Sequence, residues 1–157
     1  MTKTQRPGTR WVVGQLVLLA ALGATAPWHR GQWPALAGTV PGTLLLVYAA
    51  WTGLAGVRDL GRNRTPSPVP RPDSTLVTTG IYARLRHPLY ASMMAMGLGW
   101  ALLWSSAVGL ALAGVLAVFL HAKARHEEGH LCRHFPDYPE YLRRVPRYVP
   151  WARRAGP

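Results

Sequence analysis

The chain has 157 residues, 49% of them hydrophobic, and yet its formal net charge is +12. Long stretches carry no charge, while the arginines lie between and after these stretches, so the basicity does not indicate the continuous basic surface of a nucleic-acid-binding protein. A soluble domain of this length would not need uncharged runs long enough to cross a membrane, whereas basic flanks beside apolar spans are typical of cytoplasmic loops.

Two apolar runs near the N-terminus predict the first two transmembrane helices. The first runs from Trp11 to Trp28. The segment 24–26 resembles a signal-peptidase site, but Pro27 follows it directly and should hinder cleavage, so we expect the span to be retained. The second runs from Ala35 to Val57 and is long enough to cross the hydrocarbon core of about 30 Å.

A third apolar tract, from Leu89 to Leu120, has no charged residue across 32 positions. It is too long for one span and predicts two helices joined by a tight turn near residues 104–106. We therefore expect an all-α integral membrane protein with four transmembrane helices, the last two forming a hairpin. Residues 1–60 would form an N-terminal tail and two spans, and residues 61–157 a core made of a loop, the hairpin and a tail.

The distribution of Lys and Arg predicts the orientation in the membrane. Seventeen of the eighteen lie in the N-terminal tail, the middle loop or the C-terminal tail, and Arg30 is the exception. By the positive-inside rule, both termini are expected in the cytoplasm, with the protein integral to the cell (inner) membrane and the chemistry in a pocket at its cytoplasmic face.

The start of the third span is a candidate binding site. Pro88 suits the first turn of a helix and places His87 just outside it. Unsatisfied N–H groups at this helix start, beside Arg84 and Arg86, suit an anion such as a carboxylate. An ordinary interfacial helix start with snorkelling arginines and belt tyrosines is the alternative.

Glu127 and Glu128 are adjacent acidic residues just past the fourth span. Neighbouring side chains on a helix point about 100° apart, so the two carboxylates cannot face the same neighbour. One could turn to a ligand while the other meets Lys123, Arg125 or Arg133. A surface charge network is the alternative.

A group of histidines raises the possibility of a metal site. His126, His130 and His134 share a helix face but extend over about 12 Å, too far for all three to bind one ion on an unbroken helix. A site of two histidines stays open, and a membrane metal or haem redox protein is an alternative function. We expect no metal ligands.

Several motifs together resemble the isoprenylcysteine carboxyl methyltransferases and the related phospholipid methyltransferases, over roughly Leu60 to Pro150. They are, in order, Leu76-Val77-Thr78-Thr79-Gly80-Ile81-Tyr82, Arg86-His87-Pro88-Leu89-Tyr90, the hairpin, Glu127-Glu128, a Phe-x-x-Tyr-x-x-Tyr stretch from Phe135, and Val145-Pro146-Arg147 with Pro150.

The resemblance implies an integral-membrane enzyme that transfers a methyl group from S-adenosylmethionine to a lipophilic acceptor, without a metal. It places cofactor contacts on Leu76, Val77, Tyr82, His87, Tyr90 and Glu127, with Glu128 close by or sharing that role, and we expect Lys123 to bind the substrate. An amine or hydroxyl acceptor would need a general base, and His87 and Glu127 are the candidate catalytic residues. Ser74 and Lys123 replace the family's usual His and Arg. The methyl acceptor, its reacting atom (O, N or S) and the oligomeric state stay open, and a non-catalytic membrane subunit is a further alternative.

Overall fold

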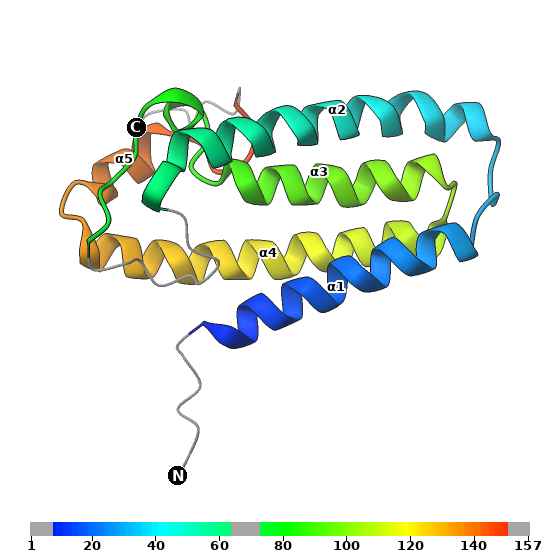
Figure 1. Ribbon diagram of the computed structural model, residues 1–157, viewed down its shortest axis with the longest axis horizontal. Helices are drawn as coiled ribbons and strands as arrows, with labels where there is room; N and C mark the ends of the chain where they lie inside the picture. The colour runs from blue at the N-terminus through cyan, green and yellow to red at the C-terminus, as the bar shows by residue number, and fades with distance from the viewer. Residues whose placement is uncertain (1–7, 64–72, 151–157) are drawn as a thin grey trace, which may run out of the picture.

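The computed structural model describes residues 8–63 and 73–150, and every regular element in these residues is a helix. The elements are α1 (Thr9–Trp28), α2 (Ala35–Leu60), η1 (Gly61–Asn63), η2 (Gly80–Ala83), α3 (Pro88–Leu103), α4 (Ala107–His134) and α5 (Tyr138–Arg144), where η denotes a short 3₁₀ helix. The long helices α2, α3 and α4 lie side by side, and α1 crosses α4 (Figure 1). The predicted all-helical fold is confirmed for this part of the chain.

Three of the described helices are long and apolar enough to cross a membrane: α1, α2 with the η1 turn that continues it, and α4. The fourth apolar helix, α3, has 16 residues and is therefore about 24 Å long, which is less than the hydrocarbon thickness of about 30 Å. These three helices make the chain a membrane protein. The structure does not establish α3 as a fourth complete span.

The apolar tract from Leu89 to Leu120 divides between α3 and α4 at the predicted turn. Pro88 is the first residue of α3, where its missing N–H is not needed. Ser106 begins α4 as its N-cap, and its hydroxyl accepts a hydrogen bond from the Gly109 N–H at 3.0 Å. The helix then continues well past the apolar tract to His134, so that its polar end extends beyond the start of α3.

Glycines allow the close approach of α2 and α3. A Cβ added to Gly42 would lie 2.8 Å from the carbonyl oxygen of Gly99, and one added to Gly38 would lie 2.1 Å from that of Leu102. Both distances are shorter than van der Waals contact, so a larger residue at either position would push the two backbones apart. Small residues serve the same purpose in many membrane helix pairs.

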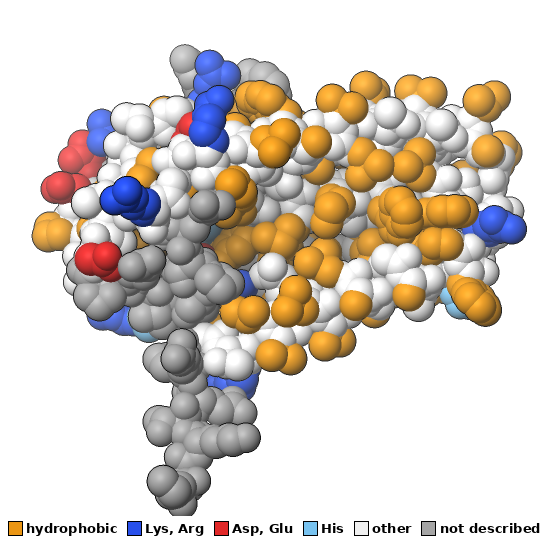
Figure 2. Space-filling view, in the orientation of Figure 1, with side chains coloured by type: hydrophobic (Ala, Val, Ile, Leu, Met, Phe, Trp, Pro, Cys, Tyr) orange, Lys and Arg blue, Asp and Glu red, His pale blue; other side chains and the backbone are white. Residues whose placement is uncertain are grey.

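The connections from α1 to α2 and from α3 to α4 lie at one end of the bundle, and the start of α3 lies at the other (Figure 1). At the connecting end, the N–H groups of Gly31 and Gln32 donate to the carbonyl oxygens of Trp104 and Ser105, each at 3.0 Å. At the opposite end, α5 packs beside the end of α4. Side chains of Lys, Arg, Asp and Glu gather around α5, while hydrophobic side chains cover much of the helical surface (Figure 2).

Candidate active site

The chain after α5 is bound directly to the start of α3. The backbone N–H of Arg86 donates to the carbonyl oxygen of Pro146 at 3.0 Å, and that of His87 donates to Arg147 at 3.1 Å. The buried guanidinium of Arg86 also donates to the Val145 carbonyl oxygen at 2.9 Å. These bonds bring the tail, which is far away in sequence, against the first turn of α3.

Two tyrosines of α5 pack into the same region. The Tyr141 hydroxyl donates to the carbonyl oxygen of Tyr82 at 2.6 Å, and Tyr138 lies against Tyr141 with ring centroids 5.6 Å apart. Burial raises the pKa of Tyr138 and of Tyr141, so both hydroxyls stay protonated and remain hydrogen-bond donors at neutral pH.

Glu128 lies at the centre of a buried ion-pair cluster. Its Oε1 is 3.1 Å from a guanidinium nitrogen of Arg86, 3.1 Å from Nε2 of His87 and 3.0 Å from Nε of Arg147, while Oε2 accepts from the second arm of Arg147. The exposed fraction of the side chain is 1% for Arg86 and 7% for Glu128. Two guanidinium groups on one carboxylate compensate its loss of hydration. The hydrogen bond to Glu128 also raises the pKa of Arg147.

This cluster fixes the orientation of His87. A carboxylate paired with two guanidinium groups is an acceptor, so the His87 nitrogen beside it, Nε2, carries the proton and Nδ1 is left as the acceptor in the neutral ring. The ring is also stacked on Tyr90, with centroids 5.3 Å apart and planes inclined by 5°. The imidazole is therefore held from its edge and from its face.

Glu127 has different partners from its neighbour. Its Oε2 accepts a hydrogen bond from the Tyr90 hydroxyl at 2.6 Å. One turn earlier on α4, the ammonium of Lys123 lies 5.4 Å from the centroid of the same Tyr90 ring, a distance typical of a cation–π contact. The two adjacent glutamates thus have separate environments, as their angular separation on the helix predicts.

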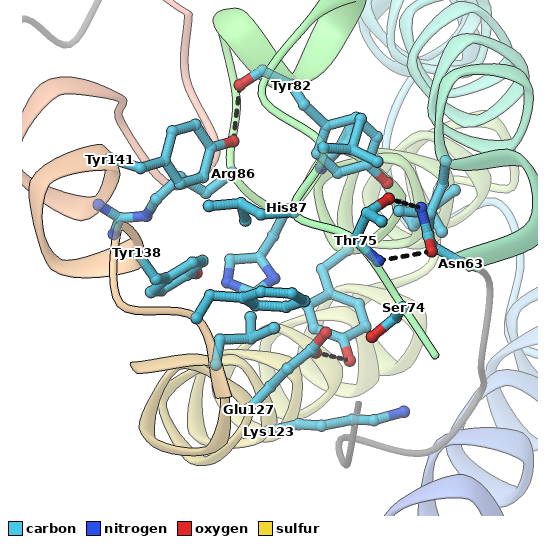
Figure 3. Close-up of a pocket in the computed structure, with 18 of the residues that line it drawn as sticks. Asn63, Ser74, Thr75, Tyr82, Arg86, His87, Lys123, Glu127, Tyr138 and Tyr141 are labelled. Carbon is cyan, nitrogen blue, oxygen red and sulfur yellow. Dashed lines mark hydrogen bonds between the residues drawn. The ribbon is translucent and has the colours of Figure 1, made fainter. Parts of the chain in front are cut away.

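A cavity of about 200 Å³ lies among these side chains (Figure 3). Seven of the residues predicted for the site line it: Leu76, Val77, Tyr82, His87, Tyr90, Lys123 and Glu127. Glu128 does not line it and instead contacts His87 from the ion-pair cluster. The structure thus brings the predicted residues together, and their roles in binding and catalysis stay predictions.

The sequence interpretation missed several residues of the cavity wall, among them Gln15, Asn63 and Thr75. Asn63 and Thr75 are joined by two hydrogen bonds, at 3.2 and 3.0 Å, across the segment 64–72, which lies outside the described residues. No pattern marks this pair in the sequence. Gln15 did have a signal, because a polar side chain within a membrane-spanning segment is usually functional.

The expected anion site at the start of α3 is occupied by a side chain of the protein. Arg86 does hold a carboxylate there, but it is the side chain of Glu128. Glu128 in turn is paired with Arg86 and Arg147 rather than with Lys123, Arg125 or Arg133. Partners 42 and 19 positions away could not be inferred from spacing along one helix.

The histidines of α4 do not form a larger cluster in the described part of the chain. Nε2 of His126 and Nε2 of His130 are 3.3 Å apart, and Arg133 contacts the other nitrogen of His130 at 3.1 Å. Within residues 8–63 and 73–150 no group of three or more His, Cys, Asp or Glu side chains is arranged to hold a metal ion.

Residues 37–138, from the first turns of α2 to the start of α5, match the sequence model of the phospholipid methyltransferase family. The chain belongs to this family. The match includes most of the cavity wall but excludes α1. The matched segment extends across the predicted boundary between residues 1–60 and residues 61–157, and this division of the chain stays a prediction.

Three curated proteins are similar to part of the chain. The cobalt-zinc-cadmium resistance protein CzcN of Cupriavidus metallidurans is 42% identical over 82 residues, which cover 51% of this chain and 38% of that protein. The nickel-cobalt-cadmium resistance protein NccN of Alcaligenes xylosoxydans xylosoxydans is 39% identical over the same shares. The protein-S-isoprenylcysteine O-methyltransferase of Schizosaccharomyces pombe is 38% identical over 50% of this chain and 34% of the enzyme. The matched segment thus spans little more than a third of each relative.

Proposed function

We propose that this protein transfers a methyl group from S-adenosylmethionine to a lipophilic acceptor at the cytoplasmic face of the membrane. The observation that carries the proposal is the cavity at the polar end of the bundle, in which the Glu127 carboxylate, the Lys123 ammonium and the Tyr90 ring meet. A chain of the phospholipid methyltransferase family with such a cavity has the groups that a charged, partly aromatic cofactor requires.

The charged and aromatic groups of the cavity suit S-adenosylmethionine. The Glu127 carboxylate suits its ammonium or its ribose hydroxyls, and the Lys123 ammonium suits a carboxylate. Aromatic faces such as those of Tyr82 and Tyr138 suit the adenine or the sulfonium cation. When bound, the cofactor supplies an electrophilic methyl group, and the residues around it need only bind and orient the reactants.

Methyl transfer is an in-line displacement, so alignment of the acceptor atom with the methyl group and exclusion of water are the protein's main contributions. The tail is bonded to the start of α3, and α5 before it places Tyr138 and Tyr141 in the cavity wall. The stacked and hydrogen-bonded His87 gives the cavity a rigid wall. Preorganised walls of this kind reduce the entropy lost in reaching the reactive geometry.

The need for a base depends on the acceptor. A carboxylate or thiolate needs none, whereas an amine or hydroxyl must lose a proton. In that case Nδ1 of His87 and the carboxylate of Glu127 are the candidate catalytic groups. Glu128 would act through His87, by holding its proton on Nε2.

The acceptor is proposed to be lipophilic because the cavity wall includes residues of the apolar helices and has an apolar lining that includes Leu76, Leu89 and Met93. The similarity to an isoprenylcysteine O-methyltransferase supports a prenylated carboxylate as one candidate. In the proposed topology α3 completes four spans, and both termini lie in the cytoplasm with the basic residues of the middle loop and the tail.

The proposal is tested by incubating membranes that contain the protein with S-adenosylmethionine labelled in its methyl group. We expect label in the extracted lipid or protein fraction, and we expect it to fall at least tenfold in Glu127→Gln, which keeps the side chain's shape but loses the charge. The same change should weaken the binding of S-adenosylhomocysteine in isothermal titration by roughly tenfold, the effect typical of losing a charged hydrogen-bond partner.

Glu140→Gln is the matched control, because Glu140 is 63% exposed and pairs with Arg144 on the surface of α5. It should leave both measurements unchanged. Equal labelling with and without the protein, together with no binding of S-adenosylhomocysteine to the wild type, would refute the proposed function.

A further inference from the structure

The N-terminal helix α1 contributes a polar side chain to the cavity. Between Trp11 and Trp28 the polar residues are Gln15 and Thr25. The Thr25 hydroxyl bonds to the carbonyl oxygen of Ala21 in its own helix, at 2.7 Å. Gln15 instead lines the cavity and bonds to residues of other helices. A polar side chain in an apolar span is expensive unless it is bonded, and it usually has a function.

Both ends of the Gln15 amide are engaged. Its Oε1 accepts a hydrogen bond from Nζ of Lys123 on α4 at 2.7 Å, and its Nε2 donates to the sulfur of Met93 on α3 at 3.2 Å. Lys123 is only 2% exposed, so its ammonium has lost most of its hydration. The Gln15 oxygen replaces part of that hydration and sets the direction of the lysine side chain.

The chemical type of this partner matters as much as its position. A carboxylate at position 15 would neutralise the ammonium, whereas an amide orients it and leaves its positive charge in place. Within the described residues, the guanidinium of Arg86 is paired with the Glu128 carboxylate, whereas the bond from Lys123 to Gln15 is to a neutral side chain.

We propose that Gln15 is a positioning residue that holds the Lys123 ammonium in the cavity as the binding group for a ligand carboxylate. This inference rests on the proposed methyltransferase function, and the carboxylate belongs either to the acceptor or to the cofactor. It makes α1 part of the functional site, although the family match begins at residue 37 and does not include α1.

The test measures binding in lipid nanodiscs with two pairs of ligands that differ in one carboxylate. The first pair is S-adenosylhomocysteine and its decarboxylated analogue. The second is an N-acetylated S-prenylcysteine and its carboxamide. For each pair, the ratio of the two dissociation constants reports how strongly the protein recognises the carboxylate, and the pair with the larger ratio identifies its source.

In the wild type we expect the carboxylate of one pair to bind at least tenfold more tightly than its neutral counterpart. Lys123→Met should abolish this preference. Gln15→Leu should reduce it roughly tenfold, because the ammonium loses its orienting partner. Gln15→Glu should also reduce it, although it keeps an oxygen near Lys123, and this result separates a charge effect from a packing effect.

A double-mutant comparison shows whether Gln15 acts through the lysine. In the Lys123→Met background, Gln15→Leu should have no further effect on the preference. Leu16→Ala is the control on the same helix, since Leu16 is 57% exposed, and it should leave the preference unchanged.

The two proposals fail in different ways. If the wild type shows the preference and neither Gln15 substitution changes it, or if the effects of Gln15→Leu and Lys123→Met are additive, the role of Gln15 is refuted while the methyltransferase proposal stands. The role of Gln15 is likewise refuted, and the methyltransferase proposal stands, if the wild type binds S-adenosylhomocysteine but shows no carboxylate preference in either pair. If it binds no member of either pair, both proposals fail.

Discussion

At the residue scale, the main feature is the different surroundings of two adjacent carboxylates. Glu127 lines the cavity and accepts a hydrogen bond from Tyr90, whereas Glu128 is buried among Arg86, Arg147 and His87. The first arrangement places a carboxylate in the wall of the cavity. The second arrangement ties α3, α4 and the tail together.

Loss of the Glu128 charge should therefore destabilise the protein. Glu128→Gln keeps the size of the side chain but leaves the buried Arg86 guanidinium and Arg147 without a counter-charge. We expect a loss of about 3–5 kcal/mol, the usual effect of breaking a buried pair by removing one partner. Thermal unfolding in detergent, followed by circular dichroism, measures it.

Glu140→Gln again provides the comparison. Its pair with Arg144 has a distance of 3.6 Å and both side chains are more than 60% exposed, so the loss should be below about 1 kcal/mol. Similar melting temperatures for the two variants would contradict a structural role for the Glu128 cluster.

At the element scale, the close packing of α2 on α3 depends on glycines, which have no side chain. Gly42 and Gly99 face each other so closely that a Cβ on either would lie 2.8 Å from the other's carbonyl oxygen. Elsewhere, as at Gly23 on α1, a Cβ would meet nothing within 4 Å. The sequence shows both kinds of glycine in apolar helices and does not distinguish them.

Alanine substitutions at these glycines should have opposite effects. Gly42→Ala should destabilise the bundle by about 1–3 kcal/mol, because its methyl group forces the helices apart. Gly23→Ala should be neutral or stabilising by up to about 1 kcal/mol, because alanine favours the helix and nothing obstructs it. Unfolding of both variants in one detergent measures the difference, and equal destabilisation would contradict the close packing at Gly42.

At the scale of the whole molecule, most charged side chains of the described residues share one end of the helical bundle with the cavity, and the other end carries the connections from α1 to α2 and from α3 to α4 (Figures 1 and 2). In the sequence, seventeen of the eighteen Lys and Arg residues lie in the N-terminal tail, the middle loop or the C-terminal tail. By the positive-inside rule we therefore propose that the cavity lies at the cytoplasmic surface.

The single native cysteine offers a direct test of this orientation. Cys132 is exposed near the end of α4, and Arg30 is exposed in the connection between α1 and α2. A membrane-impermeant maleimide should label Cys132 in inside-out vesicles and spare it in intact spheroplasts. With Arg30→Cys in a Cys132→Ser background, the pattern should reverse. Labelling of Cys132 from the outside would contradict the proposed topology.

Local sequence determined where the helices form, because each depends on residues that are neighbours in the chain. Uncharged runs predicted α1, α2 and the hairpin, and Pro88 predicted the first residue of α3. The angle between successive helical side chains predicted that Glu127 and Glu128 would have different neighbours. The spacing of Glu127, Glu128 and the histidines was likewise interpreted on a helix, and α4 does continue past Leu120 to His134.

Tertiary structure alone decided which groups meet. Glu128 pairs with Arg86 across 42 positions, and Lys123 meets Gln15 across 108. Such pairs form only when separate helices pack, and the spacing of residues along one helix contains no information about the rotation of the next. The sequence therefore determined a helical membrane protein with a polar end, and the packing of its helices decided which of the polar side chains surround the cavity and which hold it together.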